Sequence, residues 1–239
     1  MIVYHYLPAE SALKALRDRR LKISHLSEID DLLELSISEL SDLRIKSILE
    51  GFKNRVSVRY GIISFSRIYH DPVLWSHYAD GHRGVSLVFD IPDNKTIPID
   101  YRPESFIRKI DTVIQHSSFE EADLSYLIST KFSSWSYEQE IRMICDLNDR
   151  FCQIDAKGKK AYFESFSLES FGKDALKLVG LIRGTRCELK PIDISGELLA
   201  ADMLSVQDAK INPANFQIIT NNIYTLNGVK SFSACCFRV

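Results

Sequence analysis

The sequence predicts a mixed α+β fold in a single domain of residues 1–239, and three observations lead to this prediction. The chain of 239 residues is 45% hydrophobic and 26% charged, which is typical of a globular protein with a sizeable core. No Pro-, Gly- or Ser-rich linker divides it. Strand-like alternation and helical spacing both occur, with two helices early and most strands later.

The first half of the chain is predicted to alternate strands with helices. Residues 2–6 form a strand with Val3 and His5 on one face and Tyr4 and Tyr6 on the other. Pro8 then opens a helix in which apolar residues recur through Leu16. The elements expected next are a strand at 21–24, a long helix capped by Asp30 or Asp31 and running through Leu49, a strand at 56–66, a short helix at 74–80, and a strand at 84–90 that 97–101 extends.

The second half is predicted to be richer in strands. Residues 104–131 carry helical spacing, and the sequence shows no internal repeat and no low-complexity segment. The other expected elements are strands at 140–147, 163–167 and 178–182, a helix at 195–209, and strands at 215–220 and 231–237.

Composition narrows the class of protein. The longest apolar runs, such as 85–89 and 178–182, are too short to cross a bilayer, and the N-terminus lacks the pattern of a signal peptide. Five cysteines, an odd number, fit a reducing compartment, so we expect a cytoplasmic protein without a membrane partner. No C-x-x-C pair occurs, so no metal site is expected. The net charge of −2 argues against nonspecific binding of nucleic acid.

Two short motifs, each with one tryptophan, carry most of the functional information. The first runs from Leu74 to Asp90 and the second, W-S-Y-E-Q-E-I-R, ends at Arg142. Alternation along a strand would point Glu138, Glu140 and Arg142 to one face. Two carboxylates and a guanidinium suit a site for a charged ligand, although an exposed edge strand with a Glu/Arg ladder fits the pattern equally well.

Several familiar catalytic patterns are missing from the sequence. Neither G-x-G-x-x-G nor G-x-x-x-x-G-K-[ST] occurs, so a Rossmann or P-loop nucleotide site is not expected. No G-x-S-x-G elbow occurs, which argues against a serine hydrolase of that type. Cys145 is expected in the core rather than as a nucleophile. The remaining candidates are the strand histidine His5 and the hydroxyls of Ser64, Ser66 and Tyr78.

The two motifs resemble those of a large bacterial family of unknown function, W-S-x-Y-A…G-V-x-L-x-F-D followed by W-x-Y-E-x-E-x-R. The resemblance spans residues 4–184. Its N-terminal signature is matched by the Y-x-Y strand at Tyr4–Tyr6 and by Asp30–Glu34. The chain departs from the family at Asp30 in place of Asn, at Leu32 in place of Pro, and at His5, where Lys is commoner.

The opening of the chain also resembles the ADP-ribosyltransferase superfamily, which includes DNA-modifying toxins, in its strand histidine, helix and Arg20–Ser24 strand. This resemblance implies an ADP-ribosyltransferase-like mixed sheet core with flanking helices, and NAD as the substrate. It implies that His5 holds the NAD ribose, that Ser64 or Tyr78 lies near the nicotinamide, and that Glu140 is catalytic. The other site residues expected are Glu138 as a second carboxylate, and Tyr4 and Arg142 as NAD contacts, with Arg142 either paired with Glu138 or meeting the pyrophosphate.

The expected function is NAD-dependent ADP-ribosyl transfer by a toxin or phage-defence effector. A nucleic acid or a protein would be the acceptor, and an antitoxin or another partner protein would accompany a toxin. Two alternatives remain open: a catalytically silent domain that binds a nucleotide or a partner, and an NAD glycohydrolase. If the enzyme reading holds, His5 and Glu140 should line one pocket together with Ser64 or Tyr78. Trp75 and Trp135 should pack the motifs against the sheet.

Overall fold

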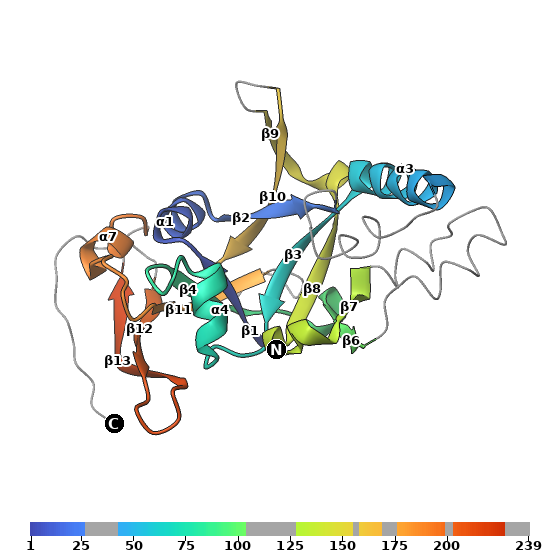
Figure 1. The fold of residues 1–239 in the computed structure, drawn as a ribbon. Coiled ribbons are helices and arrows are strands. Elements are labelled where there is room, and N and C mark those ends of the chain that lie inside the picture. The colour runs from blue at the N-terminus through green and yellow to red at the C-terminus, as the bar shows by residue number, and fades with distance from the viewer. Residues whose placement is uncertain (27–42, 104–127, 155–157, 169–175, 199–202, 228–239) are drawn as a thin grey trace. The chain divides into compact units, whose positions relative to one another are not determined.

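The computed structural model describes residues 1–26, 43–103, 128–154, 158–168, 176–198 and 203–227, and its mixed α+β architecture is drawn in Figure 1. The chain divides into two compact units, each assembled from separate stretches of sequence. Unit 1 comprises residues 1–21, 65–95 and 165–239, and unit 2 comprises 22–64 and 96–164. Three strands contribute residues to both units: β2 (Arg20–His25), β3 (Tyr60–Ser66) and β10 (Lys160–Ser167).

Unit 1 is built on a sheet with the strand order β13-β12-β11-β4-β1. Strands β11 and β12 run parallel, and the other neighbouring pairs are antiparallel. A parallel pair needs a connection that returns the chain to the same end, and the short helix α7 lies in that connection. The elements are β1 (Ile2–Leu7), α1 (Ala9–Asp18), α4 (Pro72–Tyr78), β4 (Val85–Asp90), η3 (Asp93–Lys95), β11 (Leu176–Arg183), α7 (Pro191–Ser195), β12 (Met203–Ile211) and β13 (Ile218–Asn227).

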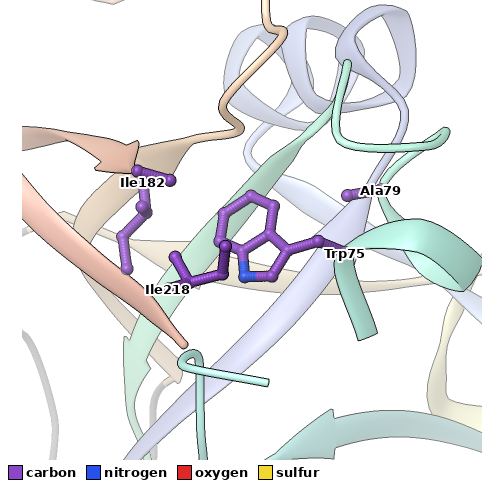
Figure 2. Packing of buried hydrophobic residues seen from close by; sticks show 5 residues of the cluster. Trp75, Ala79, Ile182 and Ile218 are labelled. Carbon is purple, nitrogen blue, oxygen red and sulfur yellow. The ribbon is translucent and has the colours of Figure 1, made fainter. Parts of the chain in front are cut away.

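Trp75 is the centre of one core cluster in unit 1. Its side chain is fully buried and, as Figure 2 shows, reaches from α4 toward Ile182 and Ile218. The indole N–H donates to the carbonyl of Tyr69 at 2.7 Å, so the ring is buried without an unpaired polar atom. Tyr6 packs edge-on against the ring, with 5.2 Å between centroids. The first tryptophan motif therefore builds a core.

The same motif also reverses the chain after α4. Asp80, Gly81 and His82 all have positive φ angles, of 48°, 57° and 70°. The strand that follows passes so close to β1 that a Cβ on Gly84 would lie 2.1 Å from the carbonyl oxygen of Leu7. Because any side chain there would displace backbone, glycine at this position is a packing requirement.

Unit 2 holds the second tryptophan motif. Its strand β8 pairs with β3 and β5, β2 pairs antiparallel with β3, and β9 pairs antiparallel with β10. Strands β6 and β7 form a separate parallel pair. The elements not yet given are α3 (Leu43–Arg59), β5 (Ile97–Pro98), β6 (Asp100–Arg102), β7 (Thr130–Phe132), η4 (Ser133–Glu138), β8 (Glu140–Asp146), η5 (Leu147–Asp149) and β9 (Phe151–Ile154).

The structure confirms the mixed α+β class and corrects three predicted elements. The strand expected at 56–66 begins only at Tyr60, because residues 56–59 belong to α3. The last residue of that helix, Arg59, pairs with Asp146. The helix expected at 195–209 is wrong: α7 ends at Ser195, and β12 replaces the rest because it hydrogen-bonds between β11 and β13. The helix expected through 131 gives way to β7 at Thr130.

A fourth predicted element is also corrected: the strand expected at 97–101 does not extend β4, because β5 pairs with β8 and β6 pairs with β7. The other expected elements agree with the structure or lie outside its described residues. The strands predicted at 2–6, 21–24, 84–90, 140–147, 163–167 and 178–182 correspond to β1, β2, β4, β8, β10 and β11, and the helices predicted after Pro8 and at 74–80 correspond to α1 and α4. The strand expected at 215–220 begins at Ile218. The Asp30–Glu34 signature, most of 104–131 and the strand at 231–237 fall on residues that are not described.

Trp75→Ala should destabilise the protein far more than Trp135→Ala. Truncating a fully buried tryptophan costs about 3–5 kcal/mol because a cavity remains, whereas Trp135 is only half-buried. Thermal unfolding followed by circular dichroism would measure the difference. Equal losses of melting temperature in the two variants would contradict the distinction between the motifs.

Candidate functional site: a buried charge quartet in unit 2

Four charged side chains from the second tryptophan motif and the strand before it are buried together in unit 2. We call Lys131, Glu138, Glu140 and Arg142 the charge quartet; their exposed fractions are 5%, 4%, 7% and 1%. Two cations offset two carboxylates, so the group is neutral. Burying an uncompensated charge is costly, and this balance is the condition for burying all four.

Lys131 and Arg142 divide the two carboxylates between them. Arg142 binds Glu140 with two parallel hydrogen bonds, Nε to Oε1 at 2.6 Å and Nη2 to Oε2 at 2.9 Å. Its Nη1 donates to the carbonyl of Ile128 at 3.0 Å. The ammonium of Lys131 lies 2.5 Å from Glu138 Oε2 and 3.4 Å from Glu140 Oε2. Lys131 therefore joins both carboxylates to β7.

The local backbone explains how Glu138 and Glu140 reach the same cation. We expected Glu138 on the strand with Glu140, but Glu138 ends the short 3-10 helix η4. Gln139 follows with a φ of 43°, a left-handed turn, and β8 begins at Glu140. Strand alternation therefore does not account for the position of Glu138. The Trp135 ring, from the same helix, lies 4.8 Å from the Lys131 ammonium, within range of a cation–π contact.

Glu140 is held as a carboxylate despite its burial. Burial raises the pKa of Glu140, but the charge of Arg142, its hydrogen bonds, the charge of Lys131 and a hydrogen bond with Ser64 outweigh this effect. The net pKa of Glu140 lies below its ordinary value. At neutral pH the site thus contains a fixed negative charge with little water around it.

Two hydroxyl groups border the quartet from neighbouring strands. Ser64, on β3, is exposed and hydrogen-bonds the Glu140 carboxylate. Tyr101, on β6, accepts the backbone N–H of Glu140 at 2.7 Å with its hydroxyl oxygen. Burial raises the pKa of Tyr101 to about 12, and the nearby carboxylates add to this effect. Both groups are neutral at physiological pH and accessible to a ligand.

The sequence candidates fall into two sets. Ser64, Glu138, Glu140 and Arg142 meet in unit 2, whereas Tyr4, His5 and Tyr78 belong to unit 1. A pocket that holds members of both sets stays a prediction. The His5 ring lies 5.5 Å from Phe65, Tyr4 lies 5.3 Å from Tyr69, and Tyr78 is 39% exposed beside His77.

Two of these candidates in unit 1 point away from each other. His5 is opposite Leu87 in the antiparallel pairing with β4, and Tyr4 is opposite Val88. Adjacent strand residues face opposite sides of the sheet, as the alternation predicted. One ligand lying on one face of β1 can therefore contact the side chain of His5 or of Tyr4, but not both.

Lys131 and Tyr101 are the site residues that sequence reasoning missed. Lys131 lies just before the second motif and was expected inside a helix, whereas Tyr101 is distant from the motif in the sequence. The parallel pairing of β6 with β7 places them opposite each other in register. Two buried carboxylates need two cations, and Arg142 supplies only one. This need, which could have pointed to Lys131, becomes visible only when the burial of both carboxylates is known.

The described residues give little support for a cysteine nucleophile, a metal site or a membrane-spanning helix. Cys145 is fully buried, as expected, and burial raises its pKa to about 12, so it is a protonated thiol rather than a nucleophile. The described residues contain no group of three His, Cys, Asp or Glu side chains arranged to hold a metal ion. Among the helices of these residues, none has the length and apolar character needed to span a membrane.

Lys131→Met should lower stability strongly, because it leaves two buried carboxylates with one cation. Removing one partner from a buried ion pair typically costs about 3–5 kcal/mol. Lys14→Met is the matched control, since Lys14 pairs with Glu10 on the exposed surface of α1. It should leave the melting temperature nearly unchanged. Comparable losses in both variants would mean that the quartet is not a buried, coupled group.

The stability of the protein should depend on the ionisation of Glu140 at acidic pH. Its pKa is lower in the folded than in the unfolded state, where it is about 4.3. The stabilisation is therefore complete above that value and is lost as pH falls through the lower folded pKa. Melting temperatures between pH 7 and pH 3 would measure it. Lys131→Met removes one of the charges that lower the pKa of Glu140, so its decline should be smaller and should end at higher pH. Parallel curves for the two proteins would contradict the coupling.

Comparison with known proteins finds one similarity in this region. Residues 74–143 match the model of a family described as "Protein of unknown function (DUF2971)". The matched segment includes both tryptophan motifs and ends just after Arg142. It confirms, for these residues, the expected similarity to a family of unknown function. No curated protein and no solved structure matches the chain.

Proposed function

We propose that the chain is an NAD-dependent ADP-ribosyltransferase-like enzyme in which Glu140 is the catalytic carboxylate, a toxin or phage-defence effector that modifies a nucleic acid or a protein. The observation that carries this proposal is the state of Glu140. It is a buried carboxylate with a lowered pKa, and an exposed hydroxyl group, that of Ser64, reaches it. The NAD chemistry itself comes from the resemblance of the opening of the chain to the ADP-ribosyltransferase superfamily.

The reaction needs a fixed negative charge at the ribose. When the bond between C1′ and the nicotinamide nitrogen breaks, its electron pair leaves with neutral nicotinamide, and positive charge develops on the ribose. A carboxylate already oriented by protein hydrogen bonds stabilises that charge without reorganisation. The two hydrogen bonds from Arg142 orient Glu140 in this way. Their effect on its pKa keeps the carboxylate ionised at neutral pH.

The contact with Ser64 supports access of a ligand to Glu140. Arg142 and Lys131 surround the carboxylate from the buried side, and both are 5% exposed or less. Ser64 is the exposed member of the group. A ribose hydroxyl approaching from the Ser64 side could hydrogen-bond the same carboxylate. This direction of approach is compatible with the expected position of Ser64 near the nicotinamide.

Glu138 is the candidate general base for the second half of the reaction. The nucleophile of the acceptor donates an electron pair to C1′ and releases a proton, which a second carboxylate could take. Glu138 is linked to Glu140 through Lys131, with the ammonium 2.5 Å and 3.4 Å from the two carboxylates. His5 remains the proposed ribose contact in unit 1. Arg142 is bound to Glu140, so it would meet a pyrophosphate only by giving up that pair.

A catalytically silent domain that binds a nucleotide or a partner is the second candidate. The observation that favours it is the internal pairing of the quartet, because each guanidinium nitrogen of Arg142 already donates to Glu140 or to the carbonyl of Ile128. Incubation with labelled NAD separates the candidates. Nicotinamide release with label on DNA, RNA or protein supports the transferase, and release without label supports an NAD glycohydrolase. The absence of both signals supports the silent domain.

Glu140→Gln should reduce nicotinamide release by roughly 10²–10³-fold, the usual effect of removing one preorganised stabilising group. The variant keeps the shape of the side chain but removes its charge. Because it also leaves the cations of the quartet in excess, some loss of stability is expected, and rates should be measured on protein shown to be folded by circular dichroism. Unchanged release in folded Glu140→Gln would refute the assignment.

Glu140→Asp and Glu138→Gln are the companion variants. Glu140→Asp keeps the quartet neutral and withdraws the carboxylate by one methylene, so release should fall, but less than in Glu140→Gln. This variant tests the assignment even if Glu140→Gln does not fold. Glu138→Gln should impair transfer to an acceptor more than NAD cleavage. If Glu138→Gln slowed NAD cleavage and transfer equally, Glu138 could not act only as the base for the nucleophile.

A further inference from the structure

Tyr101 has a hydroxyl group that the quartet does not fully use. Its ring stands on β6, opposite Lys131 in the parallel pairing with β7. The hydroxyl oxygen accepts the backbone N–H of Glu140, with 2.7 Å between the two atoms. A tyrosine hydroxyl can accept one hydrogen bond and donate another at the same time. Among the residues that the structure describes, no acceptor takes the proton of Tyr101.

That proton is both present and reachable. Burial raises the pKa of Tyr101 to about 12, so the phenol stays protonated across the physiological range. The side chain is half-buried, so part of it remains open to solvent. Because the N–H of Glu140 holds the oxygen, the direction in which the remaining proton points is limited.

The two cations near Glu140 are already engaged in ion pairs. The three guanidinium nitrogens of Arg142 donate to Glu140 and to the carbonyl of Ile128. Lys131 is bound to both carboxylates. A ligand that reaches the Glu140 carboxylate would therefore find acceptor oxygens on the carboxylate and, on a neutral side chain nearby, the hydroxyl proton of Tyr101. A sugar hydroxyl matches this pair, because it can donate to a carboxylate and accept from a phenol.

We propose that Tyr101 is a ligand-binding residue of this site, donating its hydroxyl proton to a hydroxyl oxygen of the ribose that Glu140 stabilises. The inference rests on the proposed function and adds a specific contact to it. Tyr101 would help to select a ligand with a ribose hydroxyl beside the reacting carbon. It would also hold that hydroxyl in line with the carboxylate.

Tyr101→Phe tests the contact, since it keeps the ring and removes the hydroxyl. Nicotinamide release would be compared for NAD and for two analogues in which the nicotinamide ribose lacks the 2′- or the 3′-hydroxyl. On NAD, kcat/KM should fall roughly 3- to 10-fold, the effect of one hydrogen bond. On one of the analogues the substitution should have no further effect, because the partner of the missing hydroxyl is absent. Tyr162→Phe, a half-buried tyrosine of β10, is the matched control and should match the wild type.

The outcomes separate this inference from the proposed function. A fall of equal size on NAD and on both analogues would show that Tyr101 acts only by holding the backbone of Glu140, which overturns the contact. Wild-type activity in Tyr101→Phe would overturn it as well, and the transferase proposal would stand. If the wild type releases no nicotinamide from NAD, the proposed function fails, and the assigned contact fails with it.

Discussion

The neutrality of the buried quartet is the constraint on which the architecture of unit 2 depends. Four charges withdrawn from water are tolerated only when each has a partner of opposite sign and its hydrogen bonds are satisfied. Lys131 meets this condition for two carboxylates at once. Because its partners come from η4 and β8 while it stands on β7, the ion pairs also tie these three elements together.

The two tryptophan motifs perform different physical tasks, although one family model covers both. In the first motif, Trp75 fills the core of unit 1, and Gly84 allows two backbone segments to approach closely. In the second, Trp135 is half-buried and lies over the Lys131 ammonium. The contacts of Trp75 and Gly84 in the first motif are packing contacts. The second places charged groups in a buried environment, which packing alone does not require.

The pairing that keeps Glu140 ionised also competes with any ligand of that carboxylate. Arg142 lowers the pKa of Glu140 by its charge and by two hydrogen bonds, and it occupies both carboxylate oxygens in doing so. The contacts that keep Glu140 ionised therefore also restrict the access of a ligand to its carboxylate. The exposed Ser64 and the half-buried Tyr101 mark where the two demands could be reconciled, because neutral hydroxyls can exchange partners without leaving a bare charge.

The sequence by itself determined the α+β class and most strands, and it singled out Glu138, Glu140 and Arg142 as charged residues of one motif, because alternation and motif composition are local properties. Only the tertiary structure revealed Lys131 and Tyr101, which approach the motif through pairing of strands β6 and β7. It also turned the predicted helix after Ser195 into strand β12, since hydrogen bonds to β11 and β13 outweigh local helical spacing. The same charged residues could form an exposed ladder on an edge strand or a buried quartet. Burial decides between the two, and it depends on contacts between segments that no local sequence pattern contains.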